Sequence, residues 1–187
     1  LGEFYFGAAK GCTDVVFLTI GTGIGGAVII NGALFGGYKN RGTELGHIVV
    51  EHSGPDCNCG GKGCLELYSS TTALIKQYSI RSGINIDDLS GHYIVKKCHE
   101  NEPNAVFCLQ EHTKYLGHGI ASFINTFAPQ KVVIGGGISD AGQFYIDLIR
   151  KMAFKYMMPD CGNHTDVVGA TLGNDAGSLG AATLILK

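Results

Sequence analysis

The stretch DVVFLTIGTGIGGAVIINGALF, residues 14–35, decides the fold of this chain. Residues 14–20 form a β-branched and aromatic run that stops at glycine, which is typical of a buried strand. Residues 27–30 predict a second strand. Asn31-Gly32 then favours a type I′ hairpin turn, because both central residues of that turn need positive φ, and residues 33–35 return as a third strand. The first third of the chain is therefore expected to form an antiparallel sheet.

Downstream of this stretch, the pattern alternates between strands and helices. Strands are predicted at 48–50, 131–134 and 167–170, and helices at 69–79, 87–100, 103–127, 143–158 and 176–186. We expect Asn101 to begin the long helix and Pro129 to stop it, and Asp175 to be the N-cap of the last helix. This alternation predicts an α/β fold, in which helices flank a sheet.

The composition excludes several functional classes. The 187 residues include 14 Lys+Arg and 16 Asp+Glu, giving a net charge of −2, and 45% are hydrophobic, which fits one domain. Without a basic run, the chain lacks the electrostatic basis for binding nucleic acid or an anionic membrane. It also lacks a transmembrane stretch and a secretory signal pattern. We therefore expect a cytoplasmic protein that acts on small molecules.

The glycine-rich stretch Gly21–Gly26 matches G-x-G-x-x-G. A dinucleotide-binding fold requires a helix to begin inside such a loop, whereas a strand and a hairpin follow here. Between two antiparallel strands, the loop could cradle a phosphate through its backbone N–H groups and the Thr22 hydroxyl. An ordinary tight glycine turn is the alternative, and the motif alone leaves both interpretations open.

One histidine and three of the seven cysteines fall within 18 residues: His47, Cys57, Cys59 and Cys64. This donor set suits a tetrahedral Cys₃His zinc site. Four protein ligands leave no position for an activated water, so such a zinc would be structural and would order a loop without a core of its own. The alternative is a group of free cysteines beside an unrelated histidine.

Two carboxylates flank this cluster, Glu44 before His47 and Glu66 after Cys64. Carboxylates held on a rigid scaffold are good acceptors for the hydroxyls of a polyol. Taken singly, each could equally be a solvated surface residue.

Together, these segments resemble the ROK family of bacterial sugar kinases and sugar-responsive repressors. The resemblance rests on residues 18–26 (LTIGTGIGG), 44–47 (ELGH), 57–66 (CNCGGKGCLE) and 135–139 (GGGIS), in that order. It implies an actin-like ATPase, or ribonuclease H-like, fold of two α/β domains with ATP and sugar bound between them. Residues 1–187 would be the larger C-terminal domain, with 176–187 packing back on an N-terminal domain outside this chain, and the protein would be a homodimer.

The resemblance also implies roles for individual residues. It places Glu44, His47 and Glu66 on the sugar hydroxyls, and His47, Cys57, Cys59 and Cys64 on the zinc. It places Gly21, Thr22 and Gly23 in the second phosphate-binding loop, and Gly135, Gly136 and Gly137 beside the adenosine. His47 would then use one ring nitrogen for the metal and the other for the sugar.

The resemblance implies a catalytic base that this chain lacks. Family kinases use an aspartate that would lie upstream of Leu1, and Asp14, Asp56 and Asp175 are poor substitutes for it. We therefore expect the intact protein to phosphorylate a hexose with Mg-ATP, as a glucokinase does, and residues 1–187 alone to be inactive. One alternative is the sugar-sensing domain of a ROK repressor. Another is a zinc-stabilised domain that binds no ligand.

Overall fold

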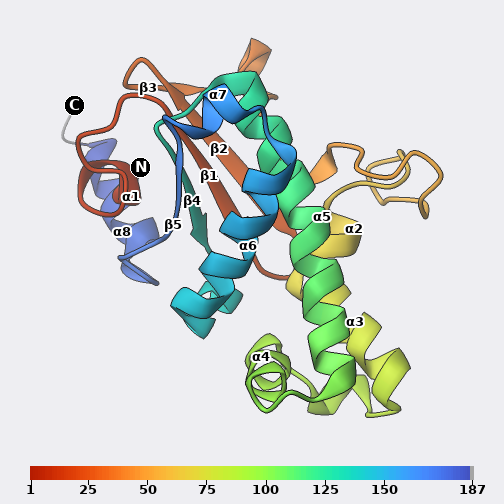
Figure 1. Cartoon of the computed structure of the whole chain (residues 1–187). Helices are drawn as coiled ribbons and strands as arrows, with labels where there is room; N and C mark the ends of the chain where they lie inside the picture. Colours follow the sequence, from red (N-terminus) through yellow and green to blue (C-terminus); the bar gives the residue numbers. More distant parts are fainter. Residues whose placement is uncertain (186–187) are drawn as a thin grey trace.

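A computed structural model describes residues 1–185 and has a five-stranded mixed sheet at its centre, in the order β3-β2-β1-β4-β5 (Figure 1). The strands are β1 (Val15–Ile20), β2 (Ile24–Ile30), β3 (Ala33–Phe35), β4 (Lys131–Gly135) and β5 (Asp166–Gly169). The first three strands pair antiparallel, as predicted, whereas β4 runs parallel to β1 and β5 parallel to β4. The predicted α/β class is confirmed.

Helices cover both faces of the sheet, with α5 and α6 on one face and α1 and α8 on the other (Figure 1). Their bounds are α1 (Gly2–Tyr5), α2 (Glu66–Ser69), α3 (Thr71–Ser82), α4 (Gly91–His99), α5 (Pro103–Phe127), α6 (Gln143–Tyr156), α7 (Pro159–Gly162) and α8 (Asp175–Thr183). Short 3₁₀ turns lie at Tyr38–Asn40, Leu45–His47, Ile86–Asp88 and Gly137–Ala141.

The sheet separates two hydrophobic cores. Val16, Leu18 and Ile20 of β1 face the larger core, which α5 and α6 complete. Val15 faces a smaller core with Phe4 from α1. Because neighbouring residues of a strand point to opposite faces, a strand buried on both sides is apolar without alternation. This explains the almost continuous apolar run that predicted β1, which the exposed Thr19 interrupts.

The long helix α5 has the bounds predicted from the sequence, Pro103–Phe127. Its start was assigned to the wrong residue, because Glu102 rather than Asn101 is the N-cap and accepts the backbone N–H groups of Asn104 and Ala105 at 3.0 and 2.6 Å. Pro at the first helical position is favourable, because its missing N–H needs no partner there. Within residues 1–185, no helix is both long and apolar enough to cross a membrane.

Three other predicted elements differ from the structure. The helix predicted over 69–79 is α3, which begins at Thr71 because Ser70 is extended and caps it by accepting the N–H of Ala73 at 3.1 Å. Residues 48–50 are not a strand, because only Val49 forms an isolated bridge, with Cys64, and a glycine-rich loop offers no neighbouring strand. The helix predicted over 87–100 is divided into the 3₁₀ turn Ile86–Asp88 and α4. Ser90 separates them, since it takes an extended conformation and its hydroxyl caps α4 by accepting the N–H of Tyr93 at 3.1 Å.

The last helix, α8, begins at Asp175, and Asn174 is its N-cap without a side-chain hydrogen bond, so the predicted cap at Asp175 was wrong. Within this chain α8 packs against α1. Leu186, the predicted end of the helix, and Lys187 lie outside the described residues. Packing of 176–187 on an N-terminal domain stays a prediction.

A polar pair is buried where α5 packs on α6. His112 is 1% exposed, and its Nε2 lies 2.7 Å from the hydroxyl of Tyr145. Burial lowers the pKa of His112 to about 3, since the apolar surroundings disfavour the charged imidazolium. The native state therefore holds His112 neutral.

His112 predicts a pH dependence of stability. Below about pH 6.5 the unfolded chain binds a proton at this histidine and the native state does not, so the free energy of unfolding falls as the pH drops toward about 3. The contribution is at most about 1.4 kcal/mol per pH unit. Urea unfolding of the protein and of His112→Gln, which replaces the imidazole by an amide that does not titrate, should show a shallower pH dependence in the variant. Parallel pH profiles would contradict this assignment.

Candidate functional site

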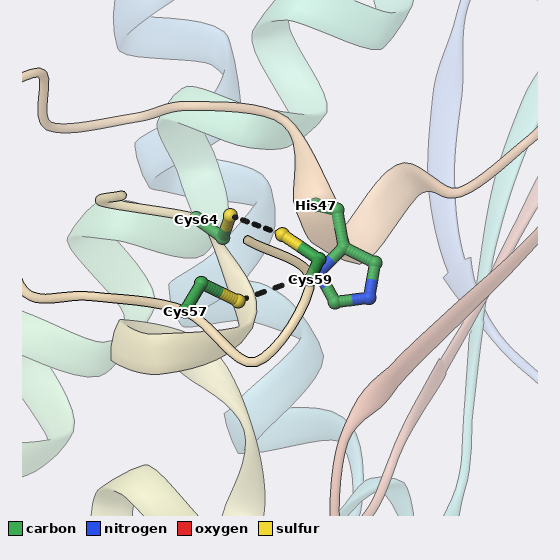
Figure 2. A group of neighbouring side chains, drawn as sticks. All are labelled: His47, Cys57, Cys59 and Cys64. Carbon is green, nitrogen blue, oxygen red and sulfur yellow. Dashed lines mark hydrogen bonds between the residues drawn. The ribbon is translucent and has the colours of Figure 1, made fainter. Parts of the chain in front are cut away.

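The four predicted metal ligands come together in the structure. The ligand atoms of His47, Cys57, Cys59 and Cys64 all lie within 4.8 Å of one another. The Cys57 Sγ is 3.6 Å from the His47 Nδ1, and the Cys59 and Cys64 sulfurs are 3.6 Å apart (Figure 2). Two segments with nine residues between them thus present one imidazole and three thiols to a common centre.

This arrangement fits a tetrahedral metal. With Zn–S near 2.3 Å and Zn–N near 2.0 Å, the edges of a tetrahedron are about 3.8 Å between sulfurs and about 3.6 Å between sulfur and nitrogen. Burial, reinforced by the neighbouring Cys57 and Cys59 thiols, raises the pKa of Cys64 to about 12. A bound divalent cation would offset the free-energy cost of ionising the buried Cys64 thiol, because it stabilises the thiolate directly. The donor set, spacing and burial therefore suit a structural metal.

The orientation of His47 leaves one ring nitrogen outside the cluster. Nδ1 faces the Cys57 sulfur, and the second nitrogen lies on the far side of the ring (Figure 2). His47 ends the 3₁₀ turn Leu45–His47, whose backbone packs against β2, since a Cβ on Gly46 would meet the carbonyl oxygen of Ile24. The outer nitrogen is therefore available for a ligand.

Glu66 reaches the glycine turn from the start of α2. Its Oε2 accepts the backbone N–H of Ile24 at 2.8 Å. A Cβ on Gly23 would collide with the same oxygen, so the turn and the carboxylate are in direct contact. Because Gly46 also packs on Ile24, the segments that carry Glu66 and His47 meet at one residue of β2.

Glu44 precedes the Leu45–His47 turn and is exposed. Its carbonyl oxygen accepts the N–H of His47 at 3.0 Å, which holds the two residues in one turn. The structure thus brings the predicted sugar ligands Glu44, His47 and Glu66 to the region around Ile24. The side chain of Glu44 is the most exposed of the three and the least restricted in its rotamers.

The glycine turn is shorter than its motif. Only Gly21, Thr22 and Gly23 connect β1 to β2, because Gly25 and Gly26 belong to β2 and pair with β1. The N–H of Gly21 donates to the carbonyl oxygen of Gly23 at 2.9 Å, and Thr22 at the tip is exposed. A strand follows the turn, which excludes the helix that a dinucleotide-binding loop requires.

The second glycine segment, Gly135–Gly137, begins at the last residue of β4. Parallel pairing of β1 and β4 brings it to the edge of the sheet where the turn Gly21–Gly23 lies. Gly136, with φ of 97°, turns the chain so closely over the end of β1 that a Cβ there would meet the carbonyl oxygen of Ile20. This turn places Gly137 with Gly21 and Thr22 around a cavity of about 270 Å³. The carboxyl ends of parallel strands are where ligands bind in open α/β sheets.

That cavity includes residues that the sequence analysis missed. Thr71 at the start of α3 and Gly91 and His92 at the start of α4 line it. The N–H of Thr71 donates to the carbonyl oxygen of Gly21 at 2.9 Å, while its buried hydroxyl finds no hydrogen-bond partner among residues 1–185. No local pattern marks these residues, because packing of α3 and α4 against the glycine turns brings them there.

A second cavity, of about 630 Å³, lies on the α8 side of the sheet and is lined by Gly135, Gly136 and Gly137. Gly137 therefore borders both cavities. Gly135, the last residue of β4, and Gly136 line only the second cavity, so the glycine segment lies between the two cavities at Gly137. This suits an extended ligand that contacts the turn through its backbone.

The mixed sheet with flanking helices defines a domain of the actin-like ATPase fold. The chain belongs to the ROK family, whose family model matches residues 1–187.

Relatives in this family include both enzymes and regulators. The chain is 38% identical to the glucokinase of Thermotoga maritima over 99% of its own length and 62% of the relative's. It is 33% identical to the xylose repressor of Bacillus spizizenii over 100% of its own length and 47% of the relative's. The chain thus spans about half to somewhat under two thirds of the length of these curated relatives.

A solved structure shows the same fold. The chain superimposes on a ROK glucokinase from Streptomyces griseus, in complex with glucose and AMPPNP, with a TM-score of 0.89 and 34% identity. The match covers 98% of this chain and 64% of that protein.

Proposed function

We propose that the full-length protein is an ATP-dependent hexose kinase of the glucokinase type, and that this chain is its C-terminal domain. The contact of Glu66 with the glycine turn carries the proposal. It joins a carboxylate suited to sugar hydroxyls to a backbone turn suited to phosphate, which is the juxtaposition that phosphoryl transfer between the two ligands requires. The glucose and AMPPNP bound to the Streptomyces griseus relative favour the same pair of ligands.

In this proposal the sugar is held by hydrogen bonds to Glu44, His47 and Glu66. Glu66 is oriented by the Ile24 N–H through Oε2, which leaves its other oxygen for a hydroxyl. His47 contributes the ring nitrogen that faces away from the cysteines. The two carboxylates would accept from sugar hydroxyls, whereas the outer nitrogen of a metal-bound His47 would donate its N–H to a sugar oxygen. Such a set rewards the fixed hydroxyl geometry of a pyranose, and glucose is the proposed substrate because of the glucokinase relatives.

Zinc is the metal we propose for the Cys₃His cluster. It would be structural, because four protein ligands complete a tetrahedron and leave no position for water. Binding would fix the tautomer and orientation of His47 through Nδ1. The zinc would thereby act on sugar binding through His47 and through the loop that leads to Glu66.

The nucleotide is proposed to lie along the two glycine segments. In the turn Gly21–Gly23, the backbone N–H groups of Thr22 and Gly23 and the Thr22 hydroxyl would donate to the phosphates, while the Gly21 N–H closes the turn on the Gly23 carbonyl oxygen. Gly135, Gly136 and Gly137 would contact the adenosine. Bound magnesium neutralises charge on the transferred phosphoryl group. The base that deprotonates the attacking sugar hydroxyl is proposed to be an aspartate upstream of Leu1, so these residues contribute positioning.

A sugar-sensing domain of a ROK repressor is the second candidate, and the 33% identity to a xylose repressor over the entire chain favours it. The glycine turn Gly21–Gly23 and the segment Gly135–Gly137 favour the kinase, because a sensor that binds only sugar has no need of them. In both cases we propose a cytoplasmic homodimer in which this domain makes no nucleic-acid contact.

The test is ADP release by the full-length protein with Mg-ATP and a panel of glucose, fructose, mannose, allose and N-acetylhexosamines. Turnover with one sugar would establish the kinase and identify its substrate. Residues 1–187 alone serve as a control and should release no ADP, since the base would be missing. Sugar binding without turnover by the full-length protein would support the sensor.

A further inference from the structure

Glu3, in the first turn of α1, is a buried carboxylate outside the site described above. It is 7% exposed. Its Oε1 accepts the backbone N–H groups of Thr171 and Leu172 at 2.8 and 2.7 Å. Its Oε2 accepts the N–H of Ala8 at 2.7 Å and the Thr171 hydroxyl at 3.2 Å. Four donors therefore converge on one side chain.

These donors come from opposite ends of the chain. Ala8 follows α1, whereas Thr171 and Leu172 form the connection between β5 and α8. Glu3 thus links α1 to the β5–α8 connection across 168 residues. Hydrogen bonds to an ionised carboxylate are roughly twice as strong as those between neutral groups. Glu3 therefore binds α1 and the β5–α8 connection strongly to each other.

The same side chain borders the cavity of about 630 Å³. Glu3 and Thr171 line this cavity together with Gly135, Gly136 and Thr19. Together, α1 and the β5–α8 connection form one wall of this cavity. The position of this wall relative to Gly135 and Gly136 therefore depends on the Glu3 hydrogen bonds.

We propose that Glu3 is a positioning residue for the nucleotide site, because it holds the β5–α8 connection and α1 at the spacing that shapes the cavity beside Gly135 and Gly136. The assignment of that cavity to a nucleotide rests on the proposed function. Glu3 itself touches no reacting atom and acts through the backbone that it holds.

The test is Glu3→Gln in the full-length protein. The amide keeps the size of the side chain and one acceptor oxygen, but its NH₂ group must face an N–H donor on either side. We expect the dissociation constant of Mg-ATP, measured calorimetrically without sugar, to rise about tenfold or more. The KM for glucose should stay within about twofold, since Glu3 does not contact the residues around Ile24.

Glu102→Gln is the matched control. Glu102 is likewise a glutamate whose carboxylate accepts backbone N–H groups, two against the three of Glu3, but it does so at the start of α5 and lines neither cavity. Its substitution should lower the melting temperature and leave the Mg-ATP dissociation constant unchanged. A weakening of Mg-ATP binding in Glu3→Gln alone therefore reports positioning rather than a general loss of stability.

The outcomes separate this inference from the kinase proposal. If the parent protein turns over and both variants bind Mg-ATP as it does, the role of Glu3 is wrong and the kinase stands. If the parent binds Mg-ATP without turnover and only Glu3→Gln binds it weakly, the role of Glu3 stands and the kinase is wrong. A parent protein that binds no Mg-ATP would overturn both.

Discussion

Replacing Cys59 by serine is expected to abolish hexose binding by the full-length protein. Cys59 is exposed, so its substitution removes a metal ligand without disturbing the hydrophobic core. Loss of the metal would release the loop that carries the other cysteines and free the His47 ring to rotate. We expect the affinity for glucose to fall at least about 100-fold, with zinc content close to zero.

The measurement combines metal analysis of the purified protein with calorimetric titration of glucose. Cys161→Ser is the control, because Cys161 lies in α7 outside the metal cluster and is a free thiol in the structure. It should retain both the metal and the wild-type glucose affinity. A zinc-free Cys59→Ser protein that binds glucose normally would show that the metal does not support the sugar site.

Replacing Gly23 by alanine is expected to lower glucose affinity about 100-fold while the fold survives. The new Cβ would collide with Oε2 of Glu66, and that oxygen is the far end of a flexible side chain. The carboxylate must therefore move and give up the N–H of Ile24, whereas the backbone can stay in place. Since the cost falls on Glu66, binding should suffer far more than stability.

Gly25→Ala is the matched control for this prediction. Gly25 lies two residues further along, in β2, and a Cβ there would meet nothing within 4 Å. The same change of residue type should leave glucose affinity unchanged. Calorimetric titration of both variants and thermal unfolding compare binding with stability. Equal glucose affinities in Gly23→Ala and the parent protein would remove Glu66 from the sugar site.

Local signals predicted most of the fold. The apolar run of β1, the Asn31-Gly32 turn and the proline at the start of α5 each act within a few residues, and the structure has all three elements. The prediction of a strand at 48–50 was wrong. A strand needs a neighbouring strand to pair with, and the side chains of the segment do not show whether one is present. The cap predicted at Asn101 was wrong because the adjacent Glu102 accepts the N–H groups at the start of α5. The cap predicted at Asp175 was wrong because α8 begins one residue earlier than expected, with Asn174 in the cap position.

The candidate metal ligands could also be predicted from their spacing alone. They are close enough along the chain for one loop to bring them together: His47, Cys57, Cys59 and Cys64. The two glycine segments were recognised individually. Their common cavity was not, since 114 residues lie between Thr22 and Gly137 and the pairing of β1 with β4 brings their strands together.

The amino-acid sequence thus contains the strand and helix patterns, the Cys₃His spacing and the family motifs, all of which depend on neighbouring residues. The contacts that build the site are of another kind. Glu66 meets Ile24 across 42 residues, and Glu3 meets Thr171 across 168. A buried carboxylate takes whichever N–H groups the packed elements present to it, and those groups have no position until the sheet and helices have assembled.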